Sequence, residues 1–202
     1  MTKNLQEIKL LSFFGLKNFF EIPQTQELIS QTLANLDEIS REHSKRVATT
    51  ARDFGKAVDF KNLDELEIAA QLHDIGKSSF REEILIKPNL SLNEKVIFQM
   101  HSVIGAKIVE ILGLPEKISK IVRAIHENPD GSGYPDRLRG KEILFEAQII
   151  GIADAFDAMT NDRGYNNVKP YAKAMAELEK GSGSKFNGEL VKVFREKIVN
   201  NF

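Results

Sequence analysis

Cysteine is absent from the 202 residues, so the chain can form no disulfide bond and no thiolate can act as nucleophile or metal ligand. Any metal must therefore be held by histidine and carboxylate side chains. A chain without cysteine suits a reducing compartment, and we expect a cytoplasmic location.

Long apolar runs and a charge excess are also missing. No stretch approaches the ~18 apolar residues that a transmembrane helix needs. The most apolar N-terminal stretch, KLLSFFGLKNFF, is interrupted by Lys17 and lacks the small-residue pattern of a signal-peptide cleavage site. Basic and acidic residues nearly balance, 28 against 29. We expect no transmembrane segment and no nucleic-acid polymer as partner.

Apolar periodicity predicts helix along almost the whole chain. In SLNEKVIFQMHSVIGAKIVEILG, apolar residues that include Leu92, Val96 and Met100 recur at three and four residues, which predicts one packed helix. Ser91 and Glu94 form a capping box at its start. Further helices are predicted in NLDELEIAAQLHDIGK, PEKISKIVRAIHE, FEAQIIGIADAFDAMT, YAKAMAELEKG and GELVKVFREKIV.

No segment has the pattern of a strand, so the sequence predicts an all-α fold. The only long turn-rich segments are NPDGSGYPDRLRG and, near the C-terminus, GSGSKFNG. Neither is long enough to be an interdomain linker, and a single compact unit with a small appendage is expected.

All four histidines, His43, His73, His101 and His126, fall on or at the ends of predicted helices. Asp154 follows His126 after an interval similar to those between the histidines. Neighbouring members of this series are 25 to 30 residues apart, about the length of a helix out and a helix back. Such spacing allows the side chains to meet at one end of a helical bundle, where metal sites are built.

Each histidine alone also has a simpler interpretation. His101 lies on a largely apolar face, where a satisfied core histidine is more common than a ligand. His43 stands among charged residues and could be exposed, and His126 could be a helix-end cation. Asp74 is harder to explain in this way, because an unpaired carboxylate after LEIAAQL would be costly to bury. A divalent cation would compensate it, and Lys77, near the helix end, either faces the same site or is solvated.

The strings EHSKRV, HDIGK and KPNL, then HENPDGSGYPDRLRG and IADAFDAMTNDRGY, appear in this order along the chain. Together they resemble the HD-GYP branch of the HD-domain metal-dependent phosphohydrolase superfamily. The resemblance begins at about Leu36. It implies an all-α HD-domain helical bundle with a C-terminal GYP-type extension over residues 37–202, preceded by an N-terminal helical extension over residues 1–36.

The resemblance also implies a metal centre with two divalent transition metals, iron or manganese. By position, His43, His73, Asp74 and Asp154 match the ligands of one metal. Asp74 would bridge to a second metal, which His101 and His126 would hold. A metal-bound hydroxide would then attack the phosphate, so that no protein nucleophile is needed.

The substrate residues follow from the same resemblance, which implies hydrolysis of cyclic di-GMP to linear pGpG and/or GMP. Lys77 matches a catalytic lysine that contacts the phosphate or the hydroxide. Substrate binding is implied for Gly133, Tyr134 and Pro135 of the GYP loop, and for Asp157 and Arg163.

The chain departs from the family in three places. Ile125 stands where many members have the first of two consecutive histidines, which predicts a weaker second metal site. Ile39 stands where members with three metals have a glutamate, which predicts no more than two metals. Asn166, after Arg163-Gly164-Tyr165, replaces the usual basic residue, so one phosphate contact is expected to be lost.

Three functions therefore stay open at this point. They are a cyclic di-GMP phosphodiesterase, an HD-type phosphohydrolase acting on another nucleotide, and a catalytically weak module that binds a cyclic dinucleotide or a signalling protein. The phenylalanines of the N-terminal extension, among them Phe13 and Phe19, are expected to dock on the core or to form a homodimer contact.

Overall fold

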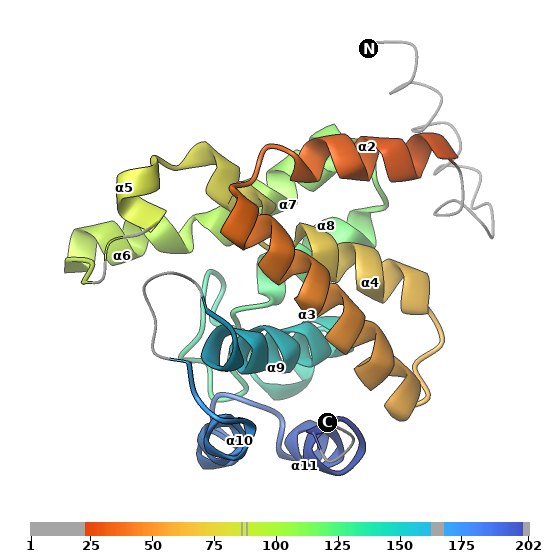
Figure 1. Ribbon diagram of the computed structural model, residues 1–202, viewed down its shortest axis with the longest axis vertical. Coiled ribbons are helices and arrows are strands. Elements are labelled where there is room, and N and C mark those ends of the chain that lie inside the picture. The colour runs from red at the N-terminus through yellow and green to blue at the C-terminus, as the bar shows by residue number, and fades with distance from the viewer. Residues whose placement is uncertain (1–22, 86, 88, 163–167, 200–202) are drawn as a thin grey trace.

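A computed structural model describes residues 23–85, 87, 89–162 and 168–199, and these residues form an all-helical fold, as predicted (Figure 1). No strand occurs in the described ranges. In chain order the helices are α2 (Pro23–Leu33), α3 (Glu38–Ala57), α4 (Leu63–Leu72), the 3-10 helix η2 (Ile75–Ser79), α5 (Glu82–Leu85), α6 (Leu92–Gln99), α7 (His101–Ile111), α8 (Glu116–Ala124), the 3-10 helix η3 (Gly140–Glu142), α9 (Phe145–Thr160), α10 (Tyr171–Lys180) and α11 (Gly188–Lys197). None of the described helices is long and apolar enough to cross a membrane.

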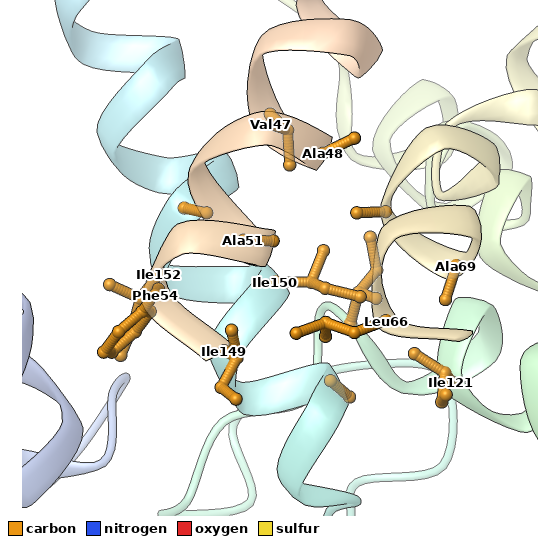
Figure 2. Packing of buried hydrophobic residues seen from close by; sticks show 14 of the residues in the cluster. Val47, Ala48, Ala51, Phe54, Leu66, Ala69, Ile121, Ile149, Ile150 and Ile152 are labelled. Carbon is orange, nitrogen blue, oxygen red and sulfur yellow. The ribbon is translucent and has the colours of Figure 1, made fainter. Parts of the chain in front are cut away.

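The core lies where α3, α4, α8 and α9 meet. Figure 2 shows Leu66 of α4 beside Ile150 of α9 in the middle of this core, with Ile121 of α8 on one side and Phe54 of α3 on the other. The C-terminal helices α10 and α11 cover the far side of α9, while α5 and α6 lie at the opposite end of the molecule (Figure 1). Helices α3 and α9 thus share one buried core, which matters because both carry site residues.

The single helix predicted across residues 91–113 is wrong, because the structure divides it at Met100 into α6 and α7. Two side chains take over carbonyls that a continuous helix would have used. His101 donates from Nδ1 to the carbonyl of Phe98 at 2.7 Å, and Ser102 donates to the carbonyl of Gln99 at 3.2 Å. Side-chain bonds of this kind compete with the helical ladder and bend it. The predicted Ser91 capping box is confirmed.

The packed face predicted for α6 is also wrong. Leu92 is 81% exposed, Val96 62% and Met100 44%, and α6 has no buried residue. The apolar periodicity of this segment therefore marks a helix whose stripe faces outward.

The predicted helix through HDIGK ends earlier than expected, at Leu72, and η2 follows it. The ring of His73 donates from Nδ1 to the carbonyl of Ala70 at 2.7 Å, the same use of a histidine at a helix end as at His101. The backbone then turns at Asp74 into η2, which packs directly on α7.

The N-terminal extension begins, within the described residues, with α2. Ile29 and Leu33 of α2 are buried in the same hydrophobic core as the rest of the bundle. Phe13 and Phe19, and with them the expected docking or dimer contact, lie outside the described residues.

Gly76 allows η2 and α7 to touch through their backbones, because a Cβ at this position would lie 1.9 Å from the carbonyl oxygen of His101 and 2.7 Å from the amide nitrogen of Gly105. We expect Gly76→Ala to lower the free energy of unfolding by about 2–4 kcal/mol, since backbone cannot yield to the added methyl as a side chain can. Urea unfolding followed by circular dichroism measures this change.

Gly188→Ala is the matched control. Its Cβ would meet the Ser182 hydroxyl at 2.8 Å, and a side-chain hydroxyl can rotate away. Equal destabilisation by the two substitutions would contradict the argument from backbone contact.

Candidate metal centre

The four histidines come from four different parts of the bundle and meet around Asp74. His43 lies in α3, His73 at the end of α4, His101 at the start of α7, and His126 just after α8. The structure therefore brings together side chains that the sequence spaces 25 to 30 residues apart.

The first set of potential ligand atoms belongs to His43, His73 and Asp74, which lie within 4.8 Å of one another. Asp154 of α9 joins them, because its Oδ1 is 3.1 Å from Nε2 of His43 and 3.9 Å from Nε2 of His73. Oδ2 of Asp74 lies 3.7 Å from Nε2 of His43 and 3.3 Å from Nε2 of His73. All four residues assigned to the first metal thus face one point.

The second set consists of Asp74, His101 and His126, again within 4.8 Å. Oδ1 of Asp74 is 3.6 Å from Nε2 of His101, and that nitrogen is 2.8 Å from Nε2 of His126. Asp74 is the one residue common to both sets, and it presents a different oxygen to each. A carboxylate placed in this way is suited to bridge two cations.

The histidine rings are held in one tautomer by bonds on their outer side. Nδ1 of His73 and of His101 faces a backbone carbonyl, which can only accept, so each Nδ1 carries the proton. Nδ1 of His43 faces Oδ2 of Asp157 at 2.6 Å in the same way. In the neutral rings, Nε2 therefore presents a lone pair to the centre, which is the arrangement that metal-binding histidines need.

These lone pairs give a direct test of whether a cation fits. Nε2 of His73 and Oδ1 of Asp74 are buried and have no hydrogen-bond partner among the described residues. With Nδ1 of His73 protonated, its Nε2 lone pair faces the carboxylate of Asp74 at 3.3 Å, which is repulsive and costly in a buried site. A divalent cation would pair with both of these atoms, so the donor set fits metal binding.

The protonation states of Asp74 and His126 also favour metal binding. Burial favours the neutral form of Asp74, but nearby positive charge, including that of Lys77, holds the pKa of its carboxyl well below the ordinary value, so it is an anion. Burial and the neighbouring His101 lower the pKa of His126 to about 3, so this imidazole is neutral at pH 7. Both groups are in the protonation state that a metal ligand requires.

Lys77 lies next to the two sets. It projects from η2, and its Nζ is 2.5 Å from Oδ2 of Asp74 and 5.5 Å from the centre of the Phe98 ring. The ring of Phe98 also contacts His101. Phe98 therefore steadies the lysine and one histidine together.

Asp157 was predicted to bind substrate, but the structure places it behind His43. It is buried, and besides His43 it accepts a bidentate pair of bonds from Arg46 at 2.8 and 3.0 Å and one from Asn161 at 2.9 Å. These contacts make it an orienting partner of His43, and its substrate role stays a prediction. Arg46 was missed from the sequence, although it stands three residues after His43 on the same face of α3.

The DGSGYP segment folds back on the residues that follow α8. Gly133 is buried against the backbone of Glu127 and Asn128, since a Cβ there would lie 2.4 Å from the amide nitrogen of Asn128. The carboxylate of Glu127 accepts from the amides of Asp136 at 2.6 Å and Leu138 at 2.9 Å. Sequence reasoning gave no role to Glu127, which fixes the loop.

This folding brings Tyr134 onto the centre. Its ring stacks on His126 with centroids 5.0 Å apart, and burial raises the pKa of its hydroxyl, so it remains a protonated donor. Pro135 follows it and lines a further cavity together with Met100. Arg163 lies outside the described residues, so its predicted contact with substrate stays a prediction.

A helical bundle with an adjacent His-Asp pair at the meeting point of two ligand sets defines a class of metal-dependent protein, and the comparisons with known proteins agree with it. Residues 27–190 match the HD domain family, and the chain belongs to that family. The resemblance to the HD-GYP branch is also confirmed.

Two curated relatives have the greatest bearing on this chain. It is 34% identical over 182 residues to "Cyclic di-GMP phosphodiesterase" of Thermotoga maritima, which covers 87% of this chain and 48% of the relative. It is also 34% identical over 200 residues to "3'3'-cGAMP-specific phosphodiesterase 2" of Vibrio cholerae, which covers 92% of this chain and 37% of the relative. The chain thus spans less than half of the length of these relatives.

Solved structures agree on the fold alone. The HDG"Y"P protein Bd1817 from Bdellovibrio bacteriovorus has a TM-score of 0.67 at 18% identity, over 96% of this chain and 67% of that one. The HD domain of the L. monocytogenes phosphodiesterase PgpH, in complex with cyclic-di-AMP, has a TM-score of 0.62 at 18% identity, over 87% of this chain and 94% of that one.

Removing metal is expected to destabilise the protein, because the facing lone pairs then repel one another without a cation between them. At a free metal concentration a hundred times the dissociation constant, binding contributes about 2.7 kcal/mol to the folded state. We expect the melting temperature to fall on chelation with EDTA and to recover when Mn²⁺ is added, as measured by differential scanning calorimetry.

Asp74→Asn should remove this response, since both ligand sets lose their shared anion. Elemental analysis of the variant after metal loading should give little or no bound metal. The control is Asp136→Asn, which changes an aspartate paired with Arg123 away from the centre and should leave metal content unchanged. Full metal content in Asp74→Asn would refute the assignment of Asp74 as the shared ligand.

Proposed function

We propose that this chain is a metal-dependent phosphodiesterase that hydrolyses a cyclic dinucleotide, with cyclic di-GMP as its substrate and linear pGpG and/or GMP as product. The observation that carries the proposal is the position of Asp74, whose two oxygens each face a separate set of histidines while Lys77 stands beside them. The two curated relatives described above, named as phosphodiesterases of cyclic dinucleotides, support the substrate class.

The proposed cofactor is a pair of divalent transition metals, iron or manganese. His43, His73, Asp74 and Asp154 would hold one, and Asp74, His101 and His126 the other. When bound, such metals supply positive charge for the phosphate and lower the pKa of water. Imidazole and carboxylate ligands suit several metals of this kind, and the ligand set itself favours none of them.

The residues of the chain supply the remaining steps. The ammonium group of Lys77 lies close to the ligand sets, where it would stabilise negative charge that develops on a phosphoryl oxygen. Tyr134, protonated and stacked on His126, would donate to a substrate oxygen and form one wall of the site. Arg46 and Asp157 would keep the ring of His43 aligned.

A second candidate function is favoured by Ile125. This side chain is buried in the hydrophobic core, so the second ligand set consists of Asp74, His101 and His126 without a further histidine. Weak binding of the second metal would make the chain a module that binds a cyclic dinucleotide and hydrolyses it slowly or not at all.

The test is incubation of the protein, loaded anaerobically with iron or manganese, with cyclic di-GMP, 3'3'-cGAMP and cyclic-di-AMP, followed by liquid chromatography of the products. We expect linear or mononucleotide product from cyclic di-GMP. Binding without product would favour the second candidate, and neither binding nor product would contradict both.

Lys77→Met should lower kcat by about two to three orders of magnitude, since it removes a charge aimed at the transition state, while metal content stays unchanged. The control is Lys61→Met, at an exposed lysine between α3 and α4. A Lys77→Met protein as active as the control would remove Lys77 from the mechanism.

A further inference from the structure

A cavity of about 450 Å³ lies beside the candidate metal centre. Its lining includes His126, Tyr134 and Asp154 on the side of the centre, and Gln148, Lys185 and Asn187 on the other side. A ligand in this cavity would therefore lie next to the potential metal ligands and yet touch residues that the mechanism above does not use.

Helix α9, which carries Gln148 and Asp154, lines this cavity together with the two turn-rich segments of the sequence. One of these is the DGSGYP segment after α8, and the other is the Gly181–Gly188 segment between α10 and α11. The amide of Asp130 donates to the carbonyl of Ser184 at 3.0 Å and joins the two. The Gly181–Gly188 turn thus lies beside the candidate metal centre, although the proposed function gives this turn no role.

The polar part of the lining includes the side-chain amides of Gln148 and Asn187, which are bonded to each other. Nε2 of Gln148 donates to the carbonyl of Ile143 at 2.9 Å, and its Oε1 accepts from Nδ2 of Asn187 at 2.8 Å. These two bonds fix which end of the Gln148 amide is donor and which is acceptor. Because an amide NH₂ has two hydrogens and an amide oxygen two lone pairs, Gln148 keeps one donor and one acceptor for a ligand.

The lining is suited to a heterocyclic base rather than to a phosphate or an apolar group. Lys185 is the only lysine or arginine among the lining residues, and it is exposed, so the part of the cavity away from the ligand sets has no cluster of positive charge for a phosphate. An apolar ligand would leave the second hydrogen and the second lone pair of the Gln148 amide unused. A planar base with alternating donors and acceptors matches a fixed amide, and the half-buried aromatic ring of Phe186 belongs to the same lining.

We propose that this cavity binds one purine base of the substrate and that Gln148 reads its edge. The inference rests on the proposed function for the identity of the substrate, since the phosphate joined to that base would lie at the ligand sets next door. It assigns the Gly181–Gly188 turn a role in base recognition.

The test compares Gln148→Leu with Gln31→Leu, which removes an exposed amide of α2 outside the cavity. Three quantities are measured on metal-loaded protein: KM for cyclic di-GMP, the dissociation constant of GMP by calorimetry, and the rate on bis(p-nitrophenyl) phosphate, which has no purine. For Gln148→Leu we expect KM and the GMP dissociation constant to rise about tenfold, the effect of losing one paired base edge. The rate on bis(p-nitrophenyl) phosphate should change less than about twofold, because the amide is absent from the chemical step.

The outcomes separate this inference from the proposed function. If wild-type protein cleaves cyclic di-GMP and Gln148→Leu leaves KM and GMP binding unchanged, the cavity does not read the base and the inference fails alone. If Gln148→Leu lowered the rate on bis(p-nitrophenyl) phosphate about tenfold as well, the inference would also be overturned, because the substitution would then act on the metal centre itself. If wild-type protein cleaves no cyclic dinucleotide but binds GMP, and only Gln148→Leu weakens that binding, the base site stands and the proposed function fails.

Discussion

The structure depends on the burial of one carboxylate, Asp74, among lone pairs that it cannot satisfy. The rings of His43, His73 and His101 are each committed on Nδ1 to an acceptor, so their other nitrogens all face the same small space. Without a cation this arrangement would favour opening of the bundle, and with one it joins α3, α4, α7 and α9. A metal bound here would therefore couple metal binding to folding.

The outer partners of the histidines explain why the helices break where they do. His73 and His101 each bond to a carbonyl three residues earlier, and each break turns the chain so that the next segment can reach the centre. The backbone contact at Gly76 then holds η2, with Lys77, against α7. Local structure, packing and the placement of charge are thus set by the same few residues.

Much of this was predictable from the sequence, because helix periodicity and the spacing of the histidines are local or regular signals. The all-α fold and most helices follow from them. The break at Met100 does not, since it arises from side-chain bonds of His101 and Ser102 that leave no periodic trace. Nor does the contact of His43 with Asp157, which joins residues 114 positions apart. Apolar residues such as Leu92 were assigned to the core because periodicity shows that a stripe exists without showing what it faces.

The central claim is that Asp74 lies between two metals, and anomalous diffraction from crystals of the iron- or manganese-loaded protein tests it most directly. The account predicts two anomalous peaks, one at the set formed by His43, His73 and Asp154 and one at the set formed by His101 and His126, with a different oxygen of Asp74 directed at each. A single peak that Asp74 does not contact, or no peak in metal-loaded crystals, would contradict it.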